Sequence, residues 1–150
     1  MTSNILNLLK RIAKMTVKDL LESVREQRYL YAAFLKDLEQ TKRDIESIKA
    51  MCFNEKVQTS YKKDLSDALI KLEEYVKKVA RARDDLTELQ HKAHNTLYLT
   101  NKCKMRAVIE LWYIVGDEWK EIAHQLDLSE AGARKLRDEF MYKYGEIKVF

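Results

Sequence analysis

Residues that break helices are missing from most of this chain. No proline occurs among its 150 residues, and its three glycines, Gly116, Gly132 and Gly145, all lie in the last third. Proline removes a backbone donor and glycine has the highest entropy cost of ordering, so nothing strongly interrupts a helix before Gly116. Charged residues make up 35% of the chain and alternate with apolar ones, which is typical of helices with one buried stripe. We therefore expect an all-α protein.

Residues 1–15 are predicted to form a short amphipathic helix. Apolar residues at helical spacing are interleaved with basic ones: Ile5, Leu6, Leu8, Leu9 and Ile12 with Lys10, Arg11 and Lys14. No small-residue cleavage site follows, which argues against a secretory signal. We expect the apolar stripe to dock on another helix, with binding at a membrane surface as the alternative. No apolar run approaches the roughly 20 residues of a transmembrane helix, so no span is expected.

Residues 16–100 carry two heptad seams, which predict a long antiparallel helical hairpin of coiled-coil type. Thr16 and Asp19 form a capping box at the start of the first helix. The first seam has two rows of residues spaced by seven: Val17, Val24, Tyr31, Leu38, Ile45 and Cys52, and Leu20, Gln27, Phe34, Thr41 and Ile48. The rows of the second seam are Leu65, Leu72, Val79, Leu86 and Ala93, and Ala68, Tyr75, Ala82, Leu89 and Thr96.

The polar stretch from Asn54 to Ser60 separates the two seams and is predicted to turn the chain. A link this short favours an antiparallel pair, because a parallel pair needs a connection as long as the helices themselves. Two helices alone leave apolar flanks open, and the expected open positions are Leu21, Leu35, Leu69 and Val76. We therefore expect a homodimer through the hairpin, or docking of the N-terminal helix on these flanks.

Residues 101–150 contain three shorter helical patterns. The expected caps and stops are Thr100 and Asn101 before the first helix, Gly116 and Asp117 after it, Ser129 before the third helix and Gly145 after it. The apolar residues expected to face inward are Trp119, Ile122, Ala123 and Leu126 in the second helix, and Ala133, Leu136, Phe140 and Tyr144 in the third. Ala123 is small where two helices would cross and Leu128 fills the turn, so GDEWKEIAHQLDLSEAGARKL has the spacing of a helix-turn-helix.

From Lys104 on, over about 45 residues, the sequence resembles the fourth region of bacterial sigma factors and the similar module of response regulators. It departs from that pattern at Trp119, where a small hydroxyl residue is usual, and at Ala133, where valine is usual. Together with LWYIVGDEW and the phrase MTVKDLLES, the chain resembles small phage proteins of Gram-positive hosts, related in layout to late-operon transcription regulators. The resemblance implies a transcription regulator that binds double-stranded DNA in the host cytoplasm.

In helix-turn-helix modules the N-terminal half of the second helix enters the major groove. Arg134 and Lys135 lie opposite the predicted buried face, so we expect them to read bases: Arg grips guanine O6 and N7, and Lys takes the same acceptors or a phosphate. The further candidates for DNA contact are Ser129, Glu130, Ala131, Arg137, Lys120, Lys104 and Lys102. Glu130 either accepts from cytosine N4 or only favours the helix N-terminus, and Arg137 is expected at the phosphate backbone.

The net charge of +4 is unevenly distributed. Residues 101–150 hold nine Lys or Arg and nine Asp or Glu, and a neutral module binds DNA weakly unless charge comes from elsewhere. Residues 75–106 hold eight basic residues against three acids, which either supply phosphate contacts or form a solvated face. Two other functions remain open: a protein-interaction module or inhibitor acting on RNA polymerase or a host defence factor, and a small terminase-like DNA-packaging protein.

Catalytic and metal-binding patterns are not found in the sequence. His91 and His94 form an HxxH pair without the third ligand of a zinc site, and Cys52 and Cys103 lie far apart, without a partner at ligand spacing. There is no glycine-rich phosphate loop and no nucleophile with a base at recognisable spacing. We expect no enzymatic activity, cofactor or metal.

Overall fold

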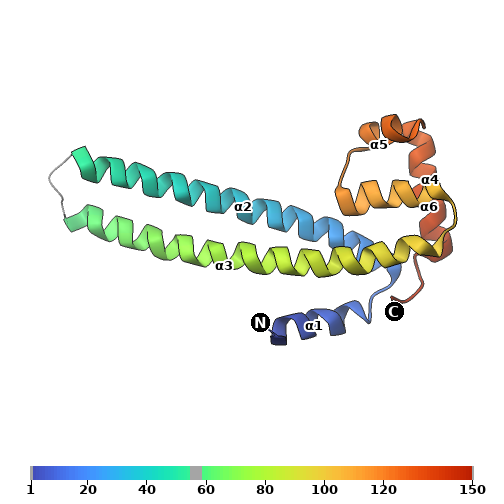
Figure 1. The fold of residues 1–150 in the computed structure, drawn as a ribbon, viewed down its shortest axis with the longest axis horizontal. Helices are drawn as coiled ribbons and strands as arrows, with labels where there is room; N and C mark the ends of the chain where they lie inside the picture. Colours follow the sequence, from blue (N-terminus) through green and yellow to red (C-terminus); the bar gives the residue numbers. More distant parts are fainter. Residues whose placement is uncertain (1, 55–58, 150) are drawn as a thin grey trace. The chain divides into compact units, whose positions relative to one another are not determined.

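The computed structural model describes residues 2–54 and 59–149, and these ranges are almost entirely helical (Figure 1). The elements are α1 (Thr2–Ile12), α2 (Val17–Asn54), α3 (Thr59–Thr96), the short 3-10 helix η1 (Leu97–Leu99), α4 (Cys103–Ile109), the π-helical segment η2 (Glu110–Val115), α5 (Trp119–Leu126) and α6 (Glu130–Tyr144). The expected all-α fold is confirmed: a long helical hairpin precedes two helices joined by a tight turn.

The hairpin consists of α2 and α3, which pack against each other and run in opposite directions (Figure 1). The described residues of both predicted seams are buried or half-buried, so the heptad pattern identifies the contact faces correctly. The capping box is also formed: the Asp19 amide donates to Thr16 Oγ1 at 3.2 Å, and the Thr16 amide donates to Asp19 Oδ2 at 3.4 Å. The side chain of Cys52 and residues 55–58 of the predicted turn lie outside the described residues.

Two compact units make up the chain, and their limits fall within the long helices. The terminal unit comprises Met1–Arg28 and Asp85–Phe150, and the hairpin unit comprises Tyr29–Asp84. The sequence suggests limits near residues 15 and 100 instead. Those positions are connections between elements, whereas the first turns of α2 and the last turns of α3 belong with the C-terminal helices because they share one buried core.

The core of the terminal unit draws apolar side chains from nearly every helix of that unit. Its fully buried large side chains are Ile12, Val17, Leu20, Leu21, Val24, Leu89, Met105, Val108, Ile109, Ile122 and Phe140. Leu21, which two helices alone are expected to leave open, is fully buried. The added helices of the terminal unit provide the cover that a helix pair alone would lack.

The C-terminal tail is joined to the start of α2. Backbone hydrogen bonds run from Val17 N–H to the Ile147 carbonyl (2.8 Å), from Lys18 N–H to the Gly145 carbonyl (3.0 Å) and from Val149 N–H to the Met15 carbonyl (3.0 Å). The first amides of a helix lack partners inside it, so the tail supplies acceptors that α2 needs. No helix within the described ranges is both long and apolar enough to cross a membrane.

Candidate nucleic-acid interface

The first helix of the C-terminal module combines α4 with the wider turn of η2. The Leu111 carbonyl accepts from the Gly116 amide at 2.8 Å and from the Asp117 amide at 2.9 Å, and Gly116 has a φ of 92°. The predicted stop at Gly116 and Asp117 is therefore confirmed. The predicted N-cap is wrong by one or two residues: Lys102 holds that position, while Thr100 Oγ1 accepts from the Lys102 amide at 3.2 Å.

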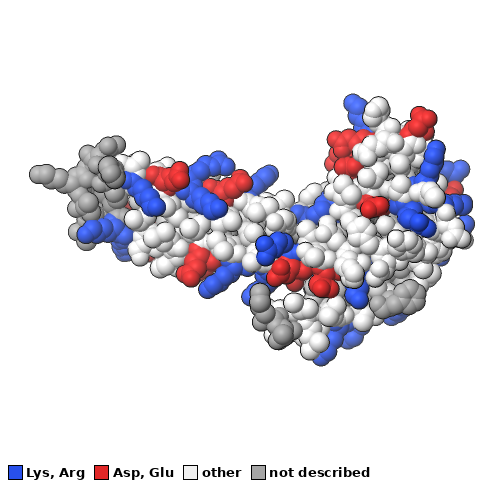
Figure 2. All heavy atoms as spheres, viewed as in Figure 1, with Lys and Arg blue, Asp and Glu red and all other residues white. Residues whose placement is uncertain are grey.

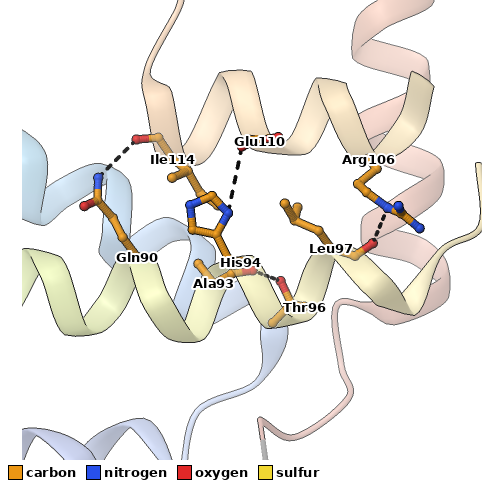
Figure 3. Close-up of polar contacts among 8 residues, drawn as sticks. All are labelled: Gln90, Ala93, His94, Thr96, Leu97, Arg106, Glu110 and Ile114. Atoms are coloured by element: carbon orange, nitrogen blue, oxygen red, sulfur yellow. Dashed lines mark hydrogen bonds and ion pairs between the residues drawn. The ribbon is translucent and has the colours of Figure 1, made fainter. Parts of the chain in front are cut away.

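The carbonyl groups at the end of η2 are satisfied by side chains from the base of the hairpin. Arg25 donates to the Trp112 carbonyl at 3.0 Å, Arg28 to those of Tyr113 and Ile114 at 3.3 and 3.2 Å, and Gln90 to that of Ile114 at 3.5 Å. Figure 3 shows the Gln90 contact, with the end of α3 and the α4–η2 helix side by side. Cations are favourable at a helix C-terminus, so the two arginines anchor this end of the module to α2.

A turn of three residues, Asp127 to Ser129, joins α5 to α6. Asp127 has a φ of 53°, in the left-handed region, and the Leu128 amide donates to the Ala123 carbonyl at 2.9 Å. Ser129 Oγ accepts from the Gly132 amide at 2.9 Å, which confirms Ser129 as the N-cap of α6. The cap and the turn agree with the sequence-based prediction, whereas the left-handed backbone of Asp127 was not predicted.

The two helices are held together by a small apolar cluster. Its buried members are Val108, Trp119, Ile122 and Ala133, and the half-buried residues packed against it are Leu111, Trp112, Leu126, Leu128 and Leu136. The inward positions predicted for Trp119 and Leu128 are confirmed. Nearby, burial raises the pKa of Tyr113 to about 12, so this phenol stays neutral and belongs to the core.

The outer face of α6 presents the predicted base-reading residues to solvent. Its exposed side chains include Glu130, Ala131, Arg134, Lys135 and Asp138. In Figure 2, blue Lys and Arg atoms gather along the edge of the module that α6 forms in Figure 1. The arrangement offers hydrogen-bond donors on one side of a helix whose other side is buried in the apolar cluster.

No known protein family matches the chain, and no curated protein or solved structure does so either. The resemblance to sigma-factor and phage-regulator modules therefore stays a prediction. The structure shows how exposed each candidate residue is and which protein groups it contacts.

Arg137 differs from the other basic candidates because it is half-buried and paired with a carboxylate of the protein. Its Nε donates to Asp138 Oδ1 at 3.1 Å, its guanidinium carbon lies 5.0 Å from the Trp119 ring centroid, and its side chain is only 28% exposed. A phosphate contact by Arg137 would have to share these partners. The structure thus sets Arg137 apart from Arg134 and Lys135, which are exposed.

The basic residues outside α6 also divide into two groups. Lys102, Lys104 and Lys120 are exposed, as expected for phosphate contacts. Arg106 instead holds the connection before α4 in place. Its Nε donates to the Leu97 carbonyl at 3.2 Å (Figure 3), and its Nη2 donates to the Thr100 carbonyl at 2.8 Å. One member of the basic excess in residues 75–106 is therefore structural.

The two histidines of the HxxH pair do not form a ligand set in the described part of the chain. His94 Nδ1 lies 3.8 Å from Glu110 Oε1, an exposed contact between α3 and η2 (Figure 3), and His91 is exposed. Among the described residues no group of three or more His, Cys, Asp or Glu side chains is placed to hold a metal ion.

Proposed function

We propose that the chain is a sequence-specific, double-stranded DNA-binding protein that regulates transcription in the manner of the phage regulators it resembles. The observation that carries the proposal is the outer face of α6. Arg134 and Lys135 are exposed on the N-terminal half of that helix, while Ala133 and Phe140 bury the opposite side. Such a helix presents guanidinium and ammonium donors to the acceptors that line a major groove.

Each candidate residue has a distinct role in this proposal. Arg134 and Lys135 contact guanine O6 and N7, and the methyl group of Ala131 suits contact with a thymine methyl. Ser129 and Glu130 stand at the helix start that approaches the groove, although the Ser129 hydroxyl is already used as a cap. Lys102, Lys104 and Lys120 contact phosphates, which positions the module without reading sequence.

Two copies would supply the affinity that one neutral module lacks. We propose that the hairpin unit mediates a homodimer, because it exposes large apolar side chains along its length: Leu30, Leu69, Ile70 and Val76. A symmetric dimer places two helix-turn-helix modules on two half-sites and so doubles the phosphate contacts. Such a regulator would act in the cytoplasm of a bacterial host.

The proposal is tested by titrating the full chain against duplexes selected from a random library and against scrambled duplexes, at two salt concentrations. Arg134→Ala should cost about 1 to 3 kcal/mol on the selected duplex and relax discrimination at one base pair. Lys104→Ala should weaken both duplexes alike and reduce the salt slope by about one unit. Lys42→Ala, an exposed change in the hairpin unit outside residues 75–106, is the control and should alter neither value.

A second candidate is a module that binds protein, such as RNA polymerase or a host defence factor. The observation that favours it is Tyr142 on α6, which is 92% exposed. The module to which α6 belongs, residues 101–150, carries no net positive charge. Exposed tyrosines are common anchors of protein interfaces. If the wild-type chain shows no salt-dependent binding to any duplex, this second function replaces the first.

A further inference from the structure

The start of α6 lies over a stacked pair of tryptophans that joins it to the base of the hairpin. The ring centroids of Trp112 in η2 and Trp119 in α5 are 4.1 Å apart, and their planes differ by 18°. The guanidinium carbon of Arg25 lies 3.6 Å from the centroid of the Trp112 ring. The two rings are too close for a guanidinium to lie between them. Arg25 therefore covers the face of Trp112 that is turned away from Trp119.

Two arginines of α6 lie at the other end of this stack. The guanidinium carbons of Arg137 and Arg134 are 5.0 and 5.7 Å from the centroid of the Trp119 ring, both within cation–π range. Arg137 is fixed further by Asp138, with Nη2 at 3.1 Å from Oδ1. Arg134 is exposed and forms no ion pair with the residues described. Among the described residues, the Trp119 ring thus lies within cation–π range of the Arg134 guanidinium.

We propose that Trp119 is a positioning residue, which holds the guanidinium of Arg134 in place for reading a base. The inference rests on the proposed DNA-binding function. A guanidinium held beside an aromatic ring by cation–π attraction uses none of its N–H groups there, so they stay free for two parallel hydrogen bonds to guanine. Ordering the side chain before binding also lowers the entropy lost on contact.

The position of Trp119 strengthens this assignment. Trp119 is buried, with 8% of the residue exposed, whereas Arg134 beside it is exposed, so the ring is a fixed support next to a solvent-facing guanidinium. A tryptophan face attracts a cation more strongly than the face of any other aromatic side chain does. Trp112 and Arg25 support the ring from beneath, so the platform is continuous from α2 to α6.

The first experiment needs no DNA. In the nuclear magnetic resonance spectrum of the free full-length protein, the Arg134 side chain should show a ring-current shift. Trp119→Leu should abolish that shift, and Trp119→Phe should retain part of it. Leu136→Ala, which weakens the same apolar cluster without removing the ring, should leave it in place. A wild-type Arg134 without such a shift, or a shift unchanged in Trp119→Leu, would overturn the inference.

The second experiment measures discrimination between the selected and scrambled duplexes, at a temperature where every variant is folded. Trp119→Leu should lower the ratio of the two affinities by roughly two- to fivefold, the size of one exposed cation–π contact, and leave scrambled binding unchanged. Trp119→Phe should recover part of the ratio, and Leu136→Ala should match the wild type. An unaltered ratio in Trp119→Leu would remove the positioning role while leaving the DNA-binding function intact. If the wild type selects no duplex, the proposed DNA-binding function is wrong. The base-reading role of Arg134 is then wrong as well, even if the resonance shift shows that Trp119 contacts Arg134.

Discussion

The terminal unit and the hairpin unit contain the same heptad pattern but bury it to different depths. In the terminal unit, Val17, Leu20 and Val24 of the first seam are fully buried. In the hairpin unit the seam is less evenly covered: Thr41, Ile45 and Ala82 are buried, but Phe34 and Leu38 are only half-buried. The difference arises because the terminal unit adds further helices around the pair, whereas the hairpin unit has α2 and α3 alone. A periodic sequence thus determines which face is covered but not how completely.

Flanking residues show the same contrast. Leu21, beside the seam in the terminal unit, is fully buried, whereas Leu69 and Val76 in the hairpin unit are 45% and 48% exposed. All three are apolar residues that flank a heptad seam in the sequence. Stability in the terminal unit should therefore depend on individual contacts, and in the hairpin unit on whatever covers its flanks.

The largest expected effect comes from removing one aromatic ring in each unit. Phe140→Ala empties a fully buried site in the terminal unit and should lower the free energy of unfolding by about 3 to 5 kcal/mol. Phe34→Ala removes the same ring from a half-buried site and should cost roughly half as much. Denaturant unfolding monitored by circular dichroism measures both.

Repeating both measurements at several protein concentrations tests whether a second copy covers the hairpin unit. If a second copy covers the hairpin unit, the cost of Phe34→Ala should grow with protein concentration, because the dimer is stabilised by mass action. The cost of Phe140→Ala should not change. Equal costs for the two variants at every concentration would contradict the difference between the units.

Local signals in the sequence predict the elements well. Thr16 and Asp19 form the expected capping box, Ser129 caps α6, and Gly116 ends the first helix of the module. Each of these depends on neighbours within a few residues along the chain. The exposure of Arg134 likewise follows from the period of one helix.

Contacts between distant segments are what the sequence does not reveal. Arg25 and Trp112 are 87 positions apart, yet the Arg25 guanidinium lies over the Trp112 ring and donates to the backbone carbonyl of Trp112. The only sign of that contact in the sequence is a basic residue next to a heptad seam. Many solvent-exposed Lys and Arg residues of the same helices have the same position, so the sign does not single out Arg25. The tail that pairs with the start of α2, the burial of Leu21 and the limits of the compact units depend in the same way on the assembled fold.

A smaller effect is expected at the junction between η2 and the base of the hairpin. Gly116 has a φ of 92°, and a Cβ added there would overlap the guanidinium of Arg28. Gly116→Ala should therefore strain the backbone and displace Arg28 from the carbonyls of Tyr113 and Ile114. The expected loss is about 2 to 4 kcal/mol, from a left-handed backbone penalty together with the partial loss of a charge-assisted hydrogen bond.

Arg28→Ala separates the two causes, since it removes the hydrogen bonds without changing the backbone. The double variant should cost less than the sum of the single ones, because the overlap disappears when the guanidinium is absent. Thermal unfolding of the four proteins completes the cycle. Strict additivity would mean that Gly116 and Arg28 act independently.

The smallest expected effect has opposite signs in the two units. Asp127 holds a φ of 53°, which glycine adopts without a Cβ penalty, so Asp127→Gly should raise the free energy of unfolding by about 0.5 kcal/mol after the added entropy of the unfolded chain is counted. Glu73→Gly places the same residue within α3 of the hairpin unit, where it should lower that energy by about 0.5 to 1 kcal/mol. Asp127→Ala, which keeps a Cβ in the left-handed region, should fall below the wild type. A stabilising Asp127→Ala would mean that the loss of the aspartate charge, and not the backbone, determines stability at this turn.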